Sequence, residues 1–176
     1  MKGAAEAERV LYLMQGVPGS GKSRIADMIA ASYTECPIIS TDDYRMQPQP
    51  MCLEHGHTGG ELVCPKCGTP DKVTVEDIYV FDAEDNARYH QMAQQAAARL
   101  MADGYQAIVI DNTNIQEWAA RPYIVLANIY GYTVEVVSVD CGLHLSMKRQ
   151  VERREDRRVP DEVIKDMYSK MERLLT

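Results

Sequence analysis

Tryptophan and phenylalanine are scarce in this chain, which has one of each among its 176 residues. Positive charge is not in excess either, since 26 acidic residues oppose 19 lysines and arginines and give a net charge of −7. Proteins that hold single-stranded nucleic acids without sequence preference use basic grooves lined with aromatic rings. We therefore do not expect the chain as a whole to bind nucleic acids through its overall charge.

Long apolar runs are absent as well, and none approaches the roughly 20 residues that span a bilayer. The early stretch VLYLM follows the acidic AEAER and leads into glycines, so it predicts a strand and not a signal peptide. A disulfide framework is disfavoured, because the five cysteines are an odd number and two of them form a C-x-x-C. Metal binding in a reducing compartment fits better, and we expect a cytoplasmic protein.

Apolar segments alternate with helical patterns along the chain. Strands are expected over residues 9–15, 36–41, 105–111 and 132–140. Helices are expected over residues 22–33, 84–103, 116–130, 143–156 and 160–175. The alternation predicts one α/β domain over residues 1–176, a three-layer sandwich around a central parallel sheet of four or five strands.

One segment departs from this pattern. Residues 46–75 are rich in proline, glycine, cysteine and histidine and poor in aliphatic side chains. A segment with so few aliphatic side chains cannot bury a core of its own. We interpret it as an insertion within the domain.

The stretch GVPGSGKS fits the pattern G-x-x-x-x-G-K-[ST] and stands between a predicted strand and a predicted helix. Its residues are Gly16, Val17, Pro18, Gly19, Ser20, Gly21, Lys22 and Ser23. In this pattern the backbone N–H groups and the helix N-terminus surround the β-phosphate. Lys22 would reach the β- and γ-phosphates, and the Ser23 hydroxyl would bind Mg²⁺. The stretch therefore predicts a P-loop for ATP or GTP with Mg²⁺.

Acidic residues follow two of the predicted strands. Asp111 ends AIVID, where its carboxylate would lie beside Mg²⁺, directly or through water; alternatively, it caps the following turn. STDDYR, at 40–45, ends another strand, and the carboxyl ends of parallel strands carry functional groups. There a carboxylate can take a proton from an attacking hydroxyl, with an arginine to orient it. Ser, Thr and Asp are also capping residues, so this stretch alone is weak evidence.

The ordered set GVPGSGKS, STDDYR, VIDNTNI, MKRQVERR and MYSKM resembles the kinase domain of phage polynucleotide 5′-kinase. YVFD and IVIDNTNIQEWAARPY resemble the NEDD4-binding-protein-2-like P-loop kinases still more. The resemblance covers nearly the whole chain except residues 46–75. It implies a kinase that transfers the γ-phosphoryl group to a hydroxyl, with the 5′-hydroxyl of a DNA or RNA end as the expected acceptor.

The resemblance also implies roles for two residues on the acceptor side. Asp42 corresponds to the general base that activates the acceptor hydroxyl. Arg45 corresponds to the arginine that positions either this base or an acceptor phosphate. The phage pattern has no acid at the position of Asp111, whereas the other relatives have one, so the ligation of Mg²⁺ stays open.

Two further arginines correspond by resemblance to a lid, which we place at residues 143–158. Arg149 and Arg153 are four residues apart, so both guanidinium groups would share one face of the predicted helix. Such a pair can bind phosphate oxygens bidentately. A solvated basic face is the alternative for this pair. We assign the other arginines of the segment to that face, namely Arg154, Arg157 and Arg158.

The acceptor has three interpretations. The phage-type resemblance favours a polynucleotide 5′-hydroxyl, whereas the acidic, aromatic-poor composition gives this less support. A nucleoside, a modified base or another small alcohol could be phosphorylated by the same Asp42 chemistry. A binding module that is switched by ATP hydrolysis is the interpretation from a different class.

The insertion contains the spacing of a four-ligand zinc site. Cys52-x₂-His55 is followed, after eight residues, by Cys64-x₂-Cys67. Thiolate and imidazole ligands in a tetrahedral arrangement suit Zn²⁺, and four protein ligands leave no open position for catalysis. His57 competes with His55, which we prefer for its symmetric spacing. We therefore predict a structural zinc site that holds the insertion as a flap against the acceptor.

Overall fold

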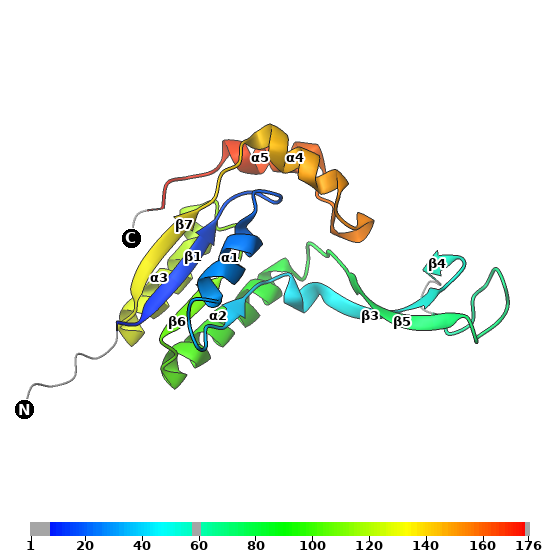
Figure 1. The fold of residues 1–176 in the computed structure, drawn as a ribbon, viewed down its shortest axis with the longest axis horizontal. Coiled ribbons are helices and arrows are strands. Elements are labelled where there is room, and N and C mark those ends of the chain that lie inside the picture. Colours follow the sequence, from blue (N-terminus) through cyan, green and yellow to red (C-terminus); the bar gives the residue numbers. More distant parts are fainter. Residues whose placement is uncertain (1–7, 58–60, 175–176) are drawn as a thin grey trace, which may run out of the picture.

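The computed structural model describes residues 8–57 and 61–174. Four parallel strands form the central sheet in the order β2-β6-β1-β7 (Figure 1). Their bounds are Val10–Gln15 for β1, Ile38–Ile39 for β2, Ala107–Ile110 for β6 and Thr133–Ser138 for β7. The predicted parallel sheet of four or five strands is confirmed, with four strands in the described residues. All four strands end at the same edge, so the loops that follow them lie together.

Helices cover both faces of this sheet, which confirms the three-layer α/β sandwich. One face is buried under α2 (Asn86–Asp103) and α3 (Glu117–Tyr130), and it presents Leu13 and Ile110 to them. The other face is covered by α1 (Lys22–Ala30), which packs against Met14 and Val109. Neighbouring strand residues alternate between the two faces, as the pleat requires.

The helix α2 buries one regular face against the sheet. Ala93, Ala97 and Met101 recur every four residues on that face and are at most 1% exposed. The helix ends at Asp103, as predicted, and Gly104 takes a left-handed φ of 82° and donates its N–H to preceding carbonyls.

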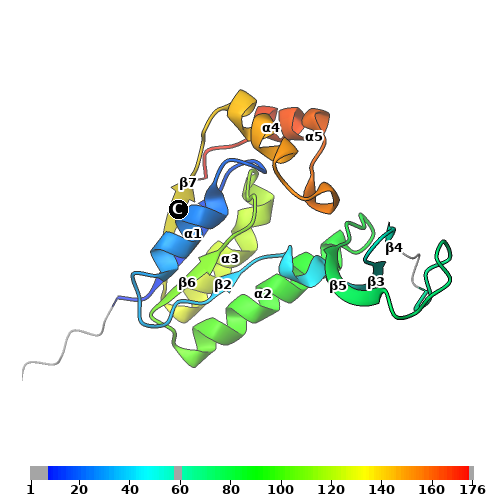
Figure 2. The same cartoon turned by 45° about the vertical axis from the view of Figure 1, so that its right-hand side comes forward.

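The last part of the chain forms a cap over the P-loop end of the domain (Figure 2). It comprises α4 (Leu143–Val151), the short helix η2 (Glu155–Arg157) and α5 (Asp161–Ser169), which buries Ile164 against Val17 and Ile115. The predicted helix over 143–156 is too long, since α4 ends at Val151. Arg158 explains this end, because its guanidinium donates to the carbonyls of Val151 and Arg153.

The predicted insertion forms a second, antiparallel sheet that projects from the domain (Figure 1). The strand β3 (Met46–Cys52) pairs with β5 (Val73–Tyr79) over its whole length and with the short β4 (Gly56–His57) at its far end. We call residues 46–79 the arm. The arm follows η1 (Asp43–Arg45), so it begins directly at the carboxyl edge of the central sheet.

None of the helices in the described ranges is long and apolar enough to cross a membrane.

We expect Ile108→Ala to lower the free energy of unfolding by about 2–5 kcal/mol, because it leaves a cavity beneath α2 and α3. Ile108 is fully buried, whereas Ile129 on α3 is 69% exposed. The matched control Ile129→Ala should change the free energy by no more than about 0.5 kcal/mol. Urea unfolding followed by circular dichroism measures both. Equal losses in the two variants would contradict the assignment of the core.

Candidate active site

The P-loop connects β1 to α1 through backbone that requires glycine. Gly19 and Gly21 have φ angles of 86° and 103°, in the left-handed region. A Cβ at Gly19 would lie 2.4 Å from the carbonyl oxygen of Ser146 on α4. A Cβ at Gly16 would lie equally close, 2.4 Å, to the carbonyl oxygen of Val139. The glycines thus allow the loop to pass closely under the cap, and a loop of this kind can direct its backbone N–H groups at a phosphate.

Lys22 opens α1 and is buried, with 9% of its surface exposed. Its Nζ donates to the carbonyl oxygen of Val17 across the loop, at 3.4 Å. Burial lowers the pKa of Lys22, and the negative charge of Asp111 opposes this shift. A buried ammonium group in a glycine-rich turn is an anion site, since it gains most from a charged partner.

The lid residues divide between the P-loop and the solvent. Arg149 donates from Nη1 to the carbonyl oxygens of Gly19 and Ser20, at 3.1 and 3.2 Å, so it lies against the P-loop. Arg153 lies beyond the end of α4 and is exposed, so the shared helix face predicted for the two arginines is wrong. The charge of Arg153 still contributes, after burial, to the lowered pKa of Lys22.

The arginines that we assigned to a solvated face have specific contacts. Arg154 pairs with Asp156 at 3.2 Å, and Arg158 closes the end of α4. Arg157 contacts Met46 of the arm and lies over the ring of Tyr79, 5.9 Å from its centroid. The cap and the arm are therefore joined through this segment.

Asp111 and Ser23 offer the oxygen ligands that Mg²⁺ prefers. The backbone N–H of Asp111 donates to Ile39 at 2.8 Å, which fixes the residue at the sheet edge. Its Oδ1 is buried and accepts no hydrogen bond from the described residues. The Ser23 hydroxyl lies exposed in the first turn of α1. A cation or its bound water beside Asp111 would satisfy the buried oxygen, so this donor set fits Mg²⁺.

Asp42 and Arg45, which were predicted for the acceptor side, form an ion pair. Nη1 of Arg45 donates to Oδ1 of Asp42 at 2.8 Å. The Asp42 side chain is 54% exposed, whereas that of Arg45 is 8% exposed. A buried guanidinium that donates to a carboxylate fixes its orientation, and this geometry favours positioning of the base over contact with an acceptor phosphate.

Three residues near this pair were not found from the sequence. The hydroxyl of Tyr79 donates to Oδ1 of Asp42 at 3.1 Å, and Asn86 accepts from Nη2 of Arg45. The ring of Phe81 lies 5.3 Å from the Arg45 guanidinium. Burial, and then the charge of Asp42, raise the pKa of Tyr79, so its phenol remains a donor. YVFD, which supported the resemblance, was the available signal for Tyr79 and Phe81.

Two asparagines of the stretch VIDNTNI hold the ends of the strands in place. Oδ1 of Asn112 accepts from both the N–H and the hydroxyl of Thr41, each at 2.9 Å. Nδ2 of Asn114 donates to the carbonyl oxygen of Met14 at 2.9 Å. The two sides of the site are thus tied to one loop, the one that also carries Asp111.

The four predicted zinc ligands come together at the far end of the arm. Their ligand atoms all lie within 4.8 Å of one another. Nδ1 of His55 is 3.6 Å from Sγ of both Cys52 and Cys64, and Sγ of Cys52 is 3.8 Å from that of Cys67. The side chain of His57 lies outside the described residues. The predicted flap is wrong in one respect, because the ligand cluster does not lie against the acceptor residue Asp42. Tyr79 at the base of the arm contacts Asp42, whereas the cluster lies at the opposite end of the β3–β5 pairing. The arm projects from the domain (Figure 1).

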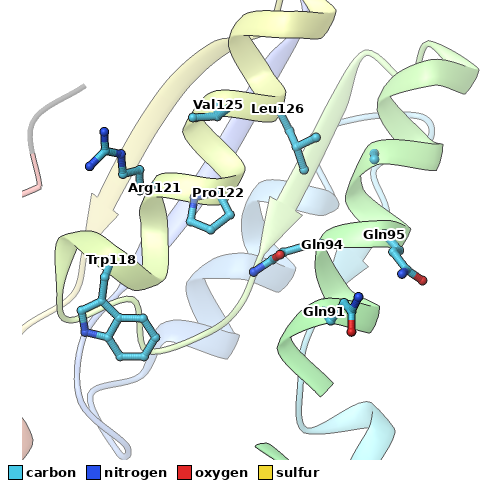
Figure 3. Close-up of a pocket in the computed structure, with 9 residues that line it drawn as sticks. Gln91, Gln94, Gln95, Trp118, Arg121, Pro122, Val125 and Leu126 are labelled. Atoms are coloured by element: carbon cyan, nitrogen blue, oxygen red, sulfur yellow. The ribbon is translucent and has the colours of Figure 1, made fainter. Parts of the chain in front are cut away.

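A groove of about 600 Å³ lies between α2 and α3, away from these residues (Figure 3). Gln91, Gln94 and Gln95 line one side, and Trp118 and Pro122 line the other. None of the predicted phosphate, acceptor or zinc residues lines it. It is therefore separate from the candidate active site.

We expect Gly19→Ala to weaken the binding of Mg²⁺-nucleotide at least about tenfold, because a Cβ there clashes with backbone of α4. Gly104→Ala is the matched control, since Gly104 has a similar φ of 82° and no atom within 4 Å of an added Cβ. The control should cost stability alone. Titration with a fluorescent ATP analogue measures both, and unchanged affinity in Gly19→Ala would contradict the P-loop assignment.

Comparison with known proteins places this geometry in a family. The family model described as "AAA domain" matches residues 11–174. Human NEDD4-binding protein 2 is 29% identical over 125 residues, which are 71% of this chain and 6% of that protein. The chain therefore spans only a small part of this curated relative.

Solved structures share the fold at low identity. A chain of the Pnkp1/Rnl/Hen1 RNA repair complex has a TM-score of 0.60 at 15% identity, over 97% of this chain and 46% of that chain. Kti12 of Chaetomium thermophilum, solved with ADP-AlF3, has a TM-score of 0.55 at 16% identity, over 93% and 80%. The predicted resemblance to the NEDD4-binding-protein-2-like kinases is confirmed. The family match covers nearly the whole chain, and the chain belongs to this AAA domain family of P-loop kinases.

Proposed function

We propose that this chain transfers the γ-phosphoryl group of ATP, or of GTP, to a hydroxyl, and that the acceptor is the 5′-hydroxyl of a polynucleotide. One observation carries the proposal. Asp42, with its carboxylate oriented by the buried Arg45, lies at the same sheet edge as the P-loop. A nucleotide site and an oriented base at one edge are the two parts that phosphoryl transfer needs.

The residues divide the reaction between them. Asp42 takes the proton of the acceptor hydroxyl as its oxygen attacks the γ-phosphorus, and the bond to the β-phosphate oxygen breaks to release the nucleoside diphosphate. Lys22 and Arg149 oppose the charge on the phosphates. Ser23 and Asp111 would hold Mg²⁺, which supplies charge neutralisation between the β- and γ-phosphates when it is bound.

Two features support a nucleotide end as the acceptor. Phe81 is 64% exposed and lies beside the guanidinium that orients Asp42, so a nucleobase could stack on its ring. A chain of a complex described as an RNA repair complex shares the fold. An end that enters beside Asp42 requires no long groove, so the overall negative charge does not exclude it.

A small alcohol, such as a nucleoside or a modified base, is the second candidate. The arm beside the acceptor side is acidic, which disfavours the phosphates of a long strand. Its acidic residues are Glu54, Glu61, Asp71, Glu76 and Asp77, against Lys66 and Lys72. A nucleotide-switched ATPase, which would need no acceptor, is the third.

The three candidates differ in where label from γ-labelled ATP goes. We expect label on the 5′ end of a DNA or RNA oligonucleotide, and loss of at least about 10²-fold in Lys22→Ala, because the phosphates lose their buried cation. Label on a panel of nucleosides and small alcohols alone would support the second candidate. Release of free phosphate alone would support the ATPase.

Asp42→Asn should lower the rate of acceptor phosphorylation by about 10²-fold or more and leave ATP affinity nearly unchanged, as loss of a general base should. Asp43→Asn is the matched control, because it removes the same charge one residue along. Burial, and then the charge of Asp42, raise the pKa of Asp43, but the described hydrogen bonds of Arg45 and Tyr79 orient the carboxylate of Asp42 and not that of Asp43. Steady-state kinetics and nucleotide titration measure both variants. A parallel loss of ATP binding in Asp42→Asn would assign Asp42 to the metal or to structure.

A further inference from the structure

We infer that Cys52, His55, Cys64 and Cys67 bind one structural zinc ion, and that this ion fixes the arm which places Tyr79 on Asp42. The metal site stands on the geometry of the arm alone. The effect on catalysis rests, in addition, on the proposed role of Asp42.

The spacing of the ligand atoms matches a tetrahedral zinc site. Bonds of about 2.3 Å to sulfur and about 2.0–2.1 Å to nitrogen give tetrahedral edges of about 3.8 Å between sulfurs and about 3.6 Å between sulfur and nitrogen. The Sγ atoms of Cys52 and Cys67 are 3.8 Å apart, and Nδ1 of His55 is 3.6 Å from two sulfurs. The hydroxyl of Thr69 lies 3.4 Å from Sγ of Cys67, where it can support a thiolate. Three thiols and an imidazole at these distances are a donor set for zinc.

The arm has almost no core apart from this cluster. In its described residues, the only buried side chains are those of Cys52 and Cys64, at 3% and 1% exposed. Val75 in β5 is 63% exposed, so the strands bury no apolar face. An isolated ribbon of this kind is marginal in water. Zinc binding supplies the missing free energy, as it does in small zinc-finger peptides, which are unfolded without the metal.

The pairing of β3 with β5 connects the metal cluster at the tip of the arm to its base, so that ordering of the tip also orders the base. The register runs without a break from Cys52 opposite Val73, at the cluster, to Met46 opposite Tyr79, at the sheet edge. Pro48 and Pro50 do not interrupt it. They are two residues apart, so their nitrogens share one edge of β3, the edge away from β5.

The base of the arm reaches both sides of the active site. The hydroxyl of Tyr79 donates to Asp42 at 3.1 Å, and its backbone N–H donates to the carboxylate of Asp156 at 2.9 Å. Asp156 belongs to the segment that follows α4, where Arg157 also contacts Met46. Tyr79 is thus a positioning residue whose place depends on the register of β3 and β5.

The first test is metal content. Purified protein should contain one zinc per chain, and Cys64→Ser with Cys67→Ser should contain less than about a tenth of that. Cys36→Ser with Cys141→Ser is the matched control and should retain zinc, because these cysteines lie outside the cluster. Wild-type protein without zinc, and unable to take it up, would overturn the metal site whatever the activity.

The second test follows the order of the arm by hydrogen exchange. Removal of zinc with a chelator should cause loss of protection in β3 and β5 and leave protection in β1 and β6 unchanged. Addition of zinc should restore the protection in the arm. An arm that stays protected without zinc would show that the ion does not hold it.

The third test connects the ion to catalysis. Tyr79→Phe should keep its zinc and its ATP affinity and lower kcat for acceptor phosphorylation about tenfold, because Asp42 loses an orienting contact. Loss of zinc should lower kcat in the wild type and cause no further loss in Tyr79→Phe. If the reductions of kcat caused by zinc removal and by Tyr79→Phe multiplied, the two would act independently, which would contradict an effect of zinc through Tyr79. Full kcat in the zinc-free wild type would overturn the connection between the ion and catalysis. If Asp42→Asn lost activity while Tyr79→Phe and the zinc-free protein kept theirs, this inference alone would be overturned and the proposed function would stand.

Discussion

The proposed acceptor side of this domain depends on one buried positive charge, the guanidinium of Arg45. A charge removed from water needs partners, and in the described residues these come from three elements. Asp42 follows β2, Tyr79 ends β5, and Asn86 opens α2. The rings of Tyr79, Phe81 and Tyr89 lie 5.3–5.9 Å from the guanidinium carbon. Because a single planar group satisfies all these contacts, the sheet, the arm and α2 meet in one arrangement.

The nucleotide side is built on a different constraint, the close passage of the P-loop under α4. Gly19 leaves no room for a Cβ, and Arg149 bonds the loop carbonyls from above. Asn112 links this side to the other, since it lies one residue after Asp111 and holds Thr41 before Asp42. The sheet edge therefore sets the distance between Asp42 and the P-loop. The backbone N–H of Tyr79 also joins the arm to the cap through the carboxylate of Asp156.

The sequence predicted those features that depend on residues close together in the chain. The P-loop follows from its glycine spacing, and the cluster of Cys52, His55, Cys64 and Cys67 follows from the spacing of these residues. The early end of α4 did not follow, because Arg158, seven residues on, bonds its last carbonyl. The strands of the arm could not be predicted from the sequence. Pro48 and Pro50 argue against a strand, because proline is tolerated only where its nitrogen faces an unpaired edge of the strand. Tyr79 reaches Asp42 across 37 residues, a contact that only the register of β3 and β5 creates.

Orientation of Asp42 decides its chemistry. The described hydrogen bonds to its carboxylate, from Arg45 and Tyr79, end on Oδ1, which leaves Oδ2 for the proton of the acceptor in the proposed reaction. If Asp42 acts as a base, the phosphoryl group moves to the acceptor in one in-line displacement. If its carboxylate were a nucleophile, a phosphoenzyme would form and the transfer would take two displacements. The most direct measurement is the stereochemistry of transfer from ATP made chiral at the γ-phosphorus. Inversion is the result we expect for direct transfer, and retention would contradict Asp42 as a base.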